Sequence, residues 1–435
     1  MQQVKKNTYY KILLMLTWFS FYFSINLNPL EFLEYNLINK IRLFLPLLFT
    51  VYIIYFKYEE IKFSNFVNLH SLLFYTIFFL YIFFCLITPK NNNINIFWPF
   101  YMFLSFFILN IFTNLIEKKY VLILTVAIVL SGFLFFFSLA LIDMYNHSSI
   151  HFYGIYGKDL KYGGFESPPR SSGLARLSLI LYALITFYYL INKKKNFFLL
   201  FVISFFALCT IIFQSRTASF IYIILSIFII IFYFKEFFYD KRLLIFSLIL
   251  PIVLNSTYQY YLVKTNIIIS DKQITISNMV QDGLFRDTLS YPENKFIEKE
   301  KRLNKFSSDR FSNWEKAHKI IKNNYFKGYG AQADRLFINQ SIHNALIYAV
   351  LSGGILAGIA IISIYIYSIF LIIRFYFFTD YKLKINFLVH FSCSLLIIVG
   401  LRSILETSFA VYSIDYLIYI IGFLFLNNHI NLSKK

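Results

Sequence analysis

Residues 308–358 read SDRFSNWEKAHKIIKNNYFKGYGAQADRLFINQSIHNALIYAVLSGGILAG, and this stretch decides how the chain is organised. Ser308 or Asp309 can cap a helix. Apolar side chains then recur at three- and four-residue spacing, at Phe311, Trp314, His318 and Ile321. This spacing predicts an amphipathic helix that lies on a surface. Glycines end it, and a His-Asn pair then leads into a continuous apolar run.

The composition is that of a membrane protein. Hydrophobic residues make up 58% of the chain and charged residues only 14%, whereas soluble domains average about half and about a quarter. The net charge of +19 comes from 41 Lys and Arg against 22 Asp and Glu. These basic residues lie mainly in short gaps between apolar runs, where they indicate topology, so we expect no nucleic-acid partner. The three cysteines fall inside apolar runs, and no disulfide framework or metal site is expected.

A helix needs about 20 apolar residues to cross a bilayer, and about twelve segments meet this condition. They are roughly 10-27, 41-56, 70-88, 96-116, 120-142, 174-191, 197-213, 217-234, 243-258, 345-373, 385-401 and 408-427. We therefore predict an all-α polytopic membrane protein with about twelve transmembrane helices, in which residues 1-435 form a single integral membrane domain.

Lysine and arginine mark alternate gaps between these segments, which predicts that both termini are cytoplasmic. The opposite side then receives a first loop, 143-173, and a large loop, 259-343, that carries the amphipathic helix. The two longest polar loops therefore share one face of the membrane.

Three patterns in this stretch resemble the O-antigen ligase and polymerase family of bacterial envelope glycosyltransferases. They are R-x-x-x-W from Arg310, G-x-G from Gly328, and H-N followed by G-G from His343. The resemblance implies transfer of an undecaprenyl-diphosphate-linked glycan to an acceptor hydroxyl on the periplasmic face of the bacterial inner membrane. It further implies inversion at the anomeric carbon, without a metal or another cofactor.

The resemblance assigns catalytic roles to Arg216, Arg310 and His343. Arg216 interrupts apolar sequence in FQSRTASF, where an arginine is costly and therefore a functional candidate. Guanidinium groups can hold a diphosphate leaving group through bidentate contacts, and an imidazole can accept a proton from a hydroxyl near neutral pH. Each residue also has an alternative role. Arg216 could be a snorkelling arginine at a turn, Arg310 a solvated charge, and His343 an interfacial histidine.

Further residues are expected to contact substrate, namely Arg170, Arg176, Asn344, Trp314 and Arg402. Arg170 and Arg176 flank SSGLA before an apolar segment, but the prolines here precede Arg170 and the usual form of the family's motif is not reproduced. Trp314 has the alternative of packing the helix onto the bundle. Arg402 has the alternative of an ion pair with Glu406, four residues further on.

The acceptor remains open at this stage. It would be lipid A-core for a ligase, which we favour, and a second lipid-linked glycan for a polymerase. A lipid-linked oligosaccharide flippase or a polysaccharide exporter is the alternative from another class. The expected partners are these substrates and membrane lipids. The large loop on one side favours an enzyme over a transporter.

Overall fold

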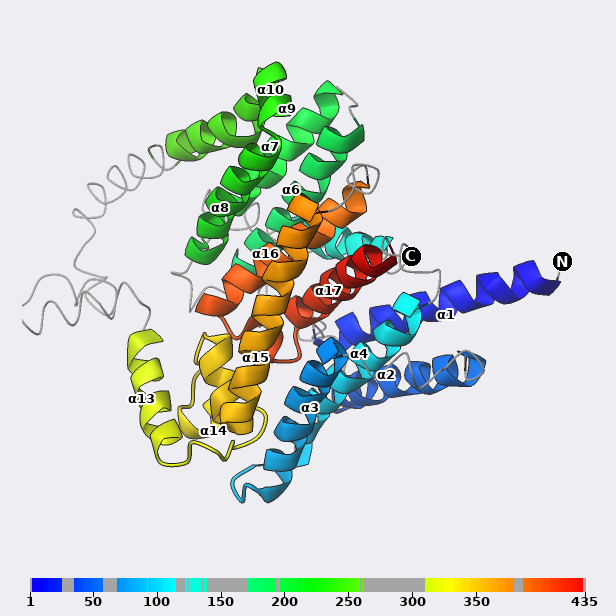
Figure 1. The fold of residues 1–435 in the computed structure, drawn as a ribbon, viewed down its shortest axis with the longest axis vertical. Helices are drawn as coiled ribbons and strands as arrows, with labels where there is room; N and C mark the ends of the chain where they lie inside the picture. Colours follow the sequence, from blue (N-terminus) through cyan, green and yellow to red (C-terminus); the bar gives the residue numbers. More distant parts are fainter. Residues whose placement is uncertain are drawn as a thin grey trace, which may run out of the picture.

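The computed structural model describes residues 2–25, 35–57, 69–91, 93–114, 122–123, 125–134, 137–138, 171–192, 196–213, 215–258, 260, 310–378 and 386–432. All regular elements within these ranges are helical (Figure 1). The prediction of an all-α chain is thus confirmed for this part of the protein. Most of the loop 143-173, and residues 261–309 of the large loop, lie outside it.

The first half of the chain contributes α1 (Gln2–Ile25), α2 (Tyr35–Lys57), α3 (Leu69–Ile87), η3 (Asn93–Ile96) and α4 (Phe97–Asn114). The middle contributes α6 (Ser171–Asn192), α7 (Phe197–Ile212), α8 (Arg216–Phe232), α9 (Phe234–Tyr239), α10 (Lys241–Leu244) and the π-helical η4 (Ile245–Ile249). The last part contributes α13 (Arg310–Lys322), α14 (Ala333–Phe337), α15 (Ala345–Phe378), α16 (Phe387–Leu405), η6 (Ser408–Ala410) and α17 (Ile414–Leu432).

Five helical segments in the described part are long and apolar enough to cross a membrane. They are His70–Ile87, Gly173–Ile191, Lys241–Tyr258, Ala345–Phe378 and Phe387–Leu405. Shorter apolar helices of 10–17 residues lie at the other predicted positions: Lys11–Ser24, Phe44–Phe56, Phe97–Asn110, Thr125–Leu134, Phe197–Ile212, Arg216–Phe232 and Ile414–Ile430. These helices define a helical membrane protein.

Helices α16 and α17 form the centre of the bundle. α17 packs against α16, α15 and α4, and α16 also packs against α6, α8 and α15. Every residue from Ile414 to Asn427 is buried, as expected for a helix that is apolar all round. Polar side chains at the ends of α16 and α17 are therefore positioned by the packing of these two helices.

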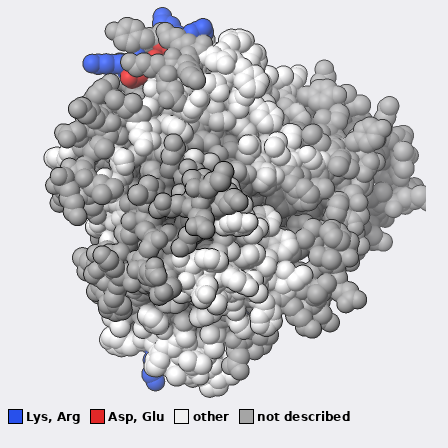
Figure 2. Space-filling view, turned by 90° about the vertical axis from the view of Figure 1, so that its right-hand side faces the viewer, with Lys and Arg blue, Asp and Glu red and all other residues white. Residues whose placement is uncertain are grey.

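The packing of α8 against α16 defines two ends of the bundle. The hydroxyl of Tyr233, just after α8, lies 2.6 Å from Nδ1 of His390, near the start of α16. The two helices are therefore antiparallel, and the first residue of α8, Arg216, lies at the same end of the bundle as Arg402, near the end of α16. On the face drawn in Figure 2, the described charged side chains gather at the height of α9 and α10 and appear again at the opposite end, with uncharged residues between them.

The predicted single span 345-373 is wrong in one respect, because the chain reverses inside it. Gly354 has φ +70° and ψ −175°, so α15 consists of two helical arms that meet there. A Cβ placed on Gly358 would lie only 2.5 Å from the Val350 side chain, whereas residues eight apart in one straight helix are separated by about 12 Å. The arm 345–353 therefore folds back along the arm 355–378, and the longer arm alone, at about 36 Å, can still cross a bilayer.

Candidate active site

Glu406 lies at the centre of a group of ionisable side chains from three distant parts of the chain. Its Oε2 is 2.6 Å from Nδ1 of His343, and its Oε1 accepts a hydrogen bond of 3.0 Å from Nη2 of Arg310. α13 supplies the arginine, the residue pair before α15 supplies the histidine, and the end of α16 supplies the carboxylate. Two of the three residues predicted to be catalytic therefore share one carboxylate.

The electrostatics of this group favour an ionised Glu406. Burial opposes ionisation, but the hydrogen bond from His343 and the charges of Arg402 and Arg310 outweigh it, so the pKa of Glu406 lies below its ordinary value. A carboxylate that accepts the Nδ1 proton fixes the imidazole tautomer. Among the residues that the structure describes, none hydrogen-bonds Nε2 of His343, and the ring is 37% exposed. Nε2 is therefore the nitrogen available to a substrate.

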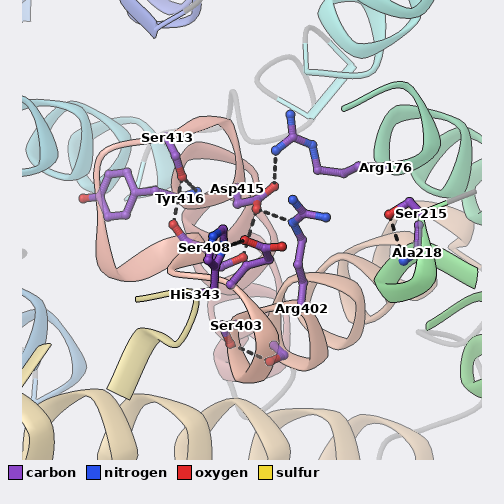
Figure 3. A network of polar contacts seen from close by, with 12 residues as sticks. Arg176, Ser215, Ala218, His343, Arg402, Ser403, Ser408, Ser413, Asp415 and Tyr416 are labelled. Atoms are coloured by element: carbon purple, nitrogen blue, oxygen red, sulfur yellow. Dashed lines mark hydrogen bonds and ion pairs between the residues drawn. The ribbon is translucent and has the colours of Figure 1, made fainter. Parts of the chain in front are cut away.

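A second carboxylate, Asp415, ties the neighbouring arginines together. It accepts hydrogen bonds of 2.9 Å from Arg176 and 2.8 Å from Arg402, and a third of 2.9 Å from Ser408 (Figure 3). The predicted pair between Arg402 and Glu406 is not formed. Glu406 is the C-cap of α16 and has extended backbone angles, φ −146° and ψ 159°, so its side chain does not follow the four-residue spacing of a helix.

The two groups together carry an excess of positive charge. Arg176, Arg310 and Arg402 face the carboxylates of Glu406 and Asp415, which leaves one net positive charge when the imidazole is neutral. Within the described part of the chain, the buried Nε of Arg176 has no hydrogen-bond partner. A partly buried site with surplus guanidinium donors has the chemistry to bind a phosphate.

Backbone geometry brings His343 to this position. His343 has a left-handed φ of +53°, an uncommon conformation for a residue other than glycine. The indole Nε1 of Trp314 donates a hydrogen bond of 2.6 Å to the carbonyl of Ile342, which supports the packing alternative for Trp314. Asn344 caps α15, since its Oδ1 accepts from the amide of Ile347, and its Nδ2 donates to the Ile404 carbonyl. Both residues thus position His343.

The glycine motifs form a second support. The amides of Tyr329 and Gly330 donate to the carbonyls of Leu351 and Ser352 at 2.9 and 2.8 Å, and the Ile355 amide donates to the Tyr325 carbonyl at 3.2 Å. These bonds satisfy backbone groups near the break in α15. A Cβ at Gly328 or Gly330 would collide with backbone of α15 or α3. The motifs G-x-G and G-G therefore pair with each other.

The helix α13 exists, but its buried face is only partly the predicted one. The buried residues are Asn313, Ala317 and Ile321, with Trp314 partly buried. Phe311 and His318 are exposed, so this part of the predicted stripe is wrong. The reason is that Asn313 turns inward, where its amide donates a hydrogen bond of 2.9 Å to Gln340, and the apolar face is rotated accordingly.

The two remaining predicted residues are Arg216 and Arg170. Arg216 is exposed in the first turn of α8, whose start is capped by Ser215 and appears in the close-up of Figure 3. The ion pairs of the network belong to other arginines. Arg170 lies outside the described residues.

Asp415 is the main residue that the sequence analysis missed. A signal was present, because Asp415 is a carboxylate in the apolar sequence YSIDYLIYII, and such a residue is a functional candidate by default. Within the described ranges, no group of three or more His, Cys, Asp and Glu side chains could hold a metal ion.

The fold and the site together define a helical membrane protein with a histidine, carboxylate and arginine cluster at one end of its bundle. Comparison of the chain with models of known protein families and with curated protein sequences finds no match. The assignment of a function therefore depends on the residues of the site and on the resemblance of their motifs.

Proposed function

We propose that the protein is a membrane glycosyltransferase that transfers a glycan from an undecaprenyl-diphosphate carrier to an acceptor hydroxyl, as its resemblance to O-antigen ligases and polymerases implies. The observation that carries this proposal is the contact of His343 with Glu406, whose other oxygen is bound by Arg310. This contact orients His343 as a base, next to arginines whose positive charge exceeds the negative charge of the carboxylates.

In the proposed reaction, Nε2 of His343 accepts the proton of the acceptor hydroxyl as its oxygen attacks the anomeric carbon. The bond between that carbon and the diphosphate oxygen breaks, and the diphosphate departs with the electron pair. Direct displacement inverts the anomeric carbon. Guanidinium groups of the cluster, together with Arg216 from the same end of the bundle, stabilise the charge that develops on the leaving group.

The same proposal includes the topology. Eleven of the predicted segments and the long arm of α15 cross the inner membrane, both termini are cytoplasmic, and the cluster faces the periplasm. The clustering of Arg176, Arg310, His343 and Arg402 at one end favours an enzyme over a flippase, since a flippase needs polar groups reachable from both sides of the bilayer.

The test uses purified protein and a polyprenyl-diphosphate oligosaccharide donor, either with lipid A-core or with more donor. A product on lipid A-core supports a ligase, and a lengthened lipid-linked glycan supports a polymerase. His343→Ala should abolish transfer, whereas His318→Ala is the matched control, because His318 is exposed on α13. Full transfer by the His343 variant would remove the proposed base, and movement of donor across a vesicle bilayer without product would support a transporter.

A further inference from the structure

The turn after α13 and the reversal of α15 lie against each other, and we call them together the hairpin tip, defined as residues 325–328 and 353–356. Its parts are joined by the hydrogen bond between the Ile355 amide and the Tyr325 carbonyl. The carbonyl of Phe326 lies where a Cβ on Gly354 would be. The two parts of the tip are therefore in direct backbone contact.

The hairpin tip exposes large apolar side chains. Phe326 is 80% exposed, Leu356 57% and Tyr325 49%. Leu86, next to the Cys85 backbone that contacts Gly330, is also exposed on the adjoining end of α3. An exposed apolar patch of this kind indicates a surface that lipid or another molecule covers.

Basic residues flank this patch in the sequence. Lys322 and Lys327 flank the turn and are exposed, and the exposed Lys90 lies with its ammonium 5.4 Å from the ring centre of Phe337. The sequence from 322 to 333 contains no acidic residue. Aromatic side chains with lysines beside them are typical of the boundary between lipid and water, where lysine reaches anionic headgroups.

The patch is also continuous with a face that lipid would cover. Along the long arm of α15, exposed apolar side chains recur at helical spacing at Leu356, Ile359, Ile362, Ile366 and Ile369. The hairpin tip lies where this stripe ends and the lysines begin. A lipid boundary at this level accounts for both features at once, whereas a protein partner would account only for the patch.

We infer that the hairpin tip binds the headgroup layer of the membrane, with Tyr325 and Phe326 in the interface and Lys322 and Lys327 on anionic phospholipid. The inference needs only the membrane class of the protein and not its proposed reaction. Its consequence for the site is geometric. The short arm from Gly353 back to Ala345 is about 13 Å long, so a tip held in the headgroup layer sets the depth of His343 in the membrane.

The experiment places a nitroxide label on Phe326→Cys in vesicles of phosphatidylglycerol and phosphatidylcholine, and compares its collisions with oxygen and with a water-soluble nickel chelate. The three native cysteines are buried. Lys316→Cys on α13 gives the exposed reference, and Ile366→Cys on the long arm gives the lipid reference. We expect nickel collisions at Phe326→Cys to be several-fold fewer than at Lys316→Cys but more than at Ile366→Cys. Tyr325→Cys repeats the measurement if the first variant is not monodisperse.

The charge of the lipid is tested with Lys322 and Lys327 both replaced by Glu. This change should move the Phe326→Cys label towards water in vesicles containing phosphatidylglycerol and leave it unchanged in pure phosphatidylcholine. Nickel access equal to that of Lys316→Cys, or no effect of the two Glu residues, would overturn the inference. Cross-linking between Phe326→Cys side chains of two copies would assign the tip to a protein interface and would overturn it as well.

Discussion

Glu406→Gln tests the proposed chemistry most directly, because it removes a charge and preserves the shape of the side chain. Glu406 makes two charge-assisted hydrogen bonds, 2.6 Å to His343 and 3.0 Å to Arg310. A glutamine offers one oxygen and one amide nitrogen. Because the arginine can only donate, the glutamine oxygen turns to Arg310 and its amide turns to Nδ1. The imidazole must then carry its proton on Nε2, which can no longer act as a base.

The magnitude of the effect follows from these contacts. A general base contributes about 10²–10⁴-fold to a reaction rate, and we expect Glu406→Gln to lower kcat within that range while KM changes little. In free energy, the loss of folding stability in Glu406→Gln should be smaller than this loss of catalysis. Weakening hydrogen bonds to a charged group costs about 1.5–3 kcal/mol, and the 20% exposure of the Glu406 side chain places the cost at the low end.

The assay combines glycan transfer with nitrogen NMR of histidine-labelled protein, in which His343→Ala identifies the signal of interest. We expect the proton on Nδ1 in the wild type and on Nε2 in Glu406→Gln. A Glu406→Gln enzyme with nearly the wild-type kcat would refute the reasoning. The NMR measurement is independent of the reaction, so a wild type with its proton on Nε2 would refute the orienting role of Glu406 even if transfer occurs.

Three further predictions follow from the same structure. Arg216→Lys should lose most transfer activity although it keeps the charge, because an ammonium cannot reproduce bidentate phosphate contacts; a nearly wild-type rate in the transfer assay would indicate a topological role. The pKa of Glu406 is lowered in the folded protein, so its carboxylate stabilises the fold at pH values above its ordinary pKa of about 4.5, and this contribution is lost as the pH falls through the lowered pKa. The melting temperature of the wild type should therefore fall more steeply below pH 4.5 than that of Glu406→Gln. Parallel curves of melting temperature against pH would contradict this. Gly354→Ala should destabilise the protein by about 1–3 kcal/mol, since φ of +70° with ψ of −175° is a conformation nearly exclusive to glycine and a Cβ would meet the Phe326 carbonyl. Gly173→Ala is its control for thermal unfolding, because a Cβ at that helical position meets nothing within 4 Å. Equal melting temperatures would contradict the strain at Gly354.

The positions of the apolar helices could be predicted because a bilayer requires each crossing segment to satisfy its own backbone hydrogen bonds. Apolar runs such as 385-401 and 408-427 therefore appear as α16 and α17. The reversal at Gly354 could not be predicted in this way. Hydropathy counts apolar residues and contains no information about φ, and G-G is equally suited to close packing of two helices and to a left-handed bend.

The partners of the charged residues were predicted less well, and the end of a helix explains why. The spacing of Arg402 and Glu406 predicts a pair only if the helix continues to Glu406, but α16 ends at Leu405. The extended backbone there frees Glu406 to bind His343 and Arg310, while Arg402 turns to Asp415. Ion pairs between distant segments depend on which helices pack together, and no local pattern specifies that.

The carboxylates of Asp415 and Glu406 have different roles, which their burial and their partners indicate. Asp415 has a side chain only 4% exposed and is bound by Arg176, Arg402 and Ser408. Removal of one partner from such a buried network costs about 3–5 kcal/mol, because it leaves charge uncompensated. Glu406 is more exposed and accepts from the one imidazole of the cluster. Asp415 therefore holds α6, α16 and α17 together, whereas Glu406 contributes less to stability and orients His343.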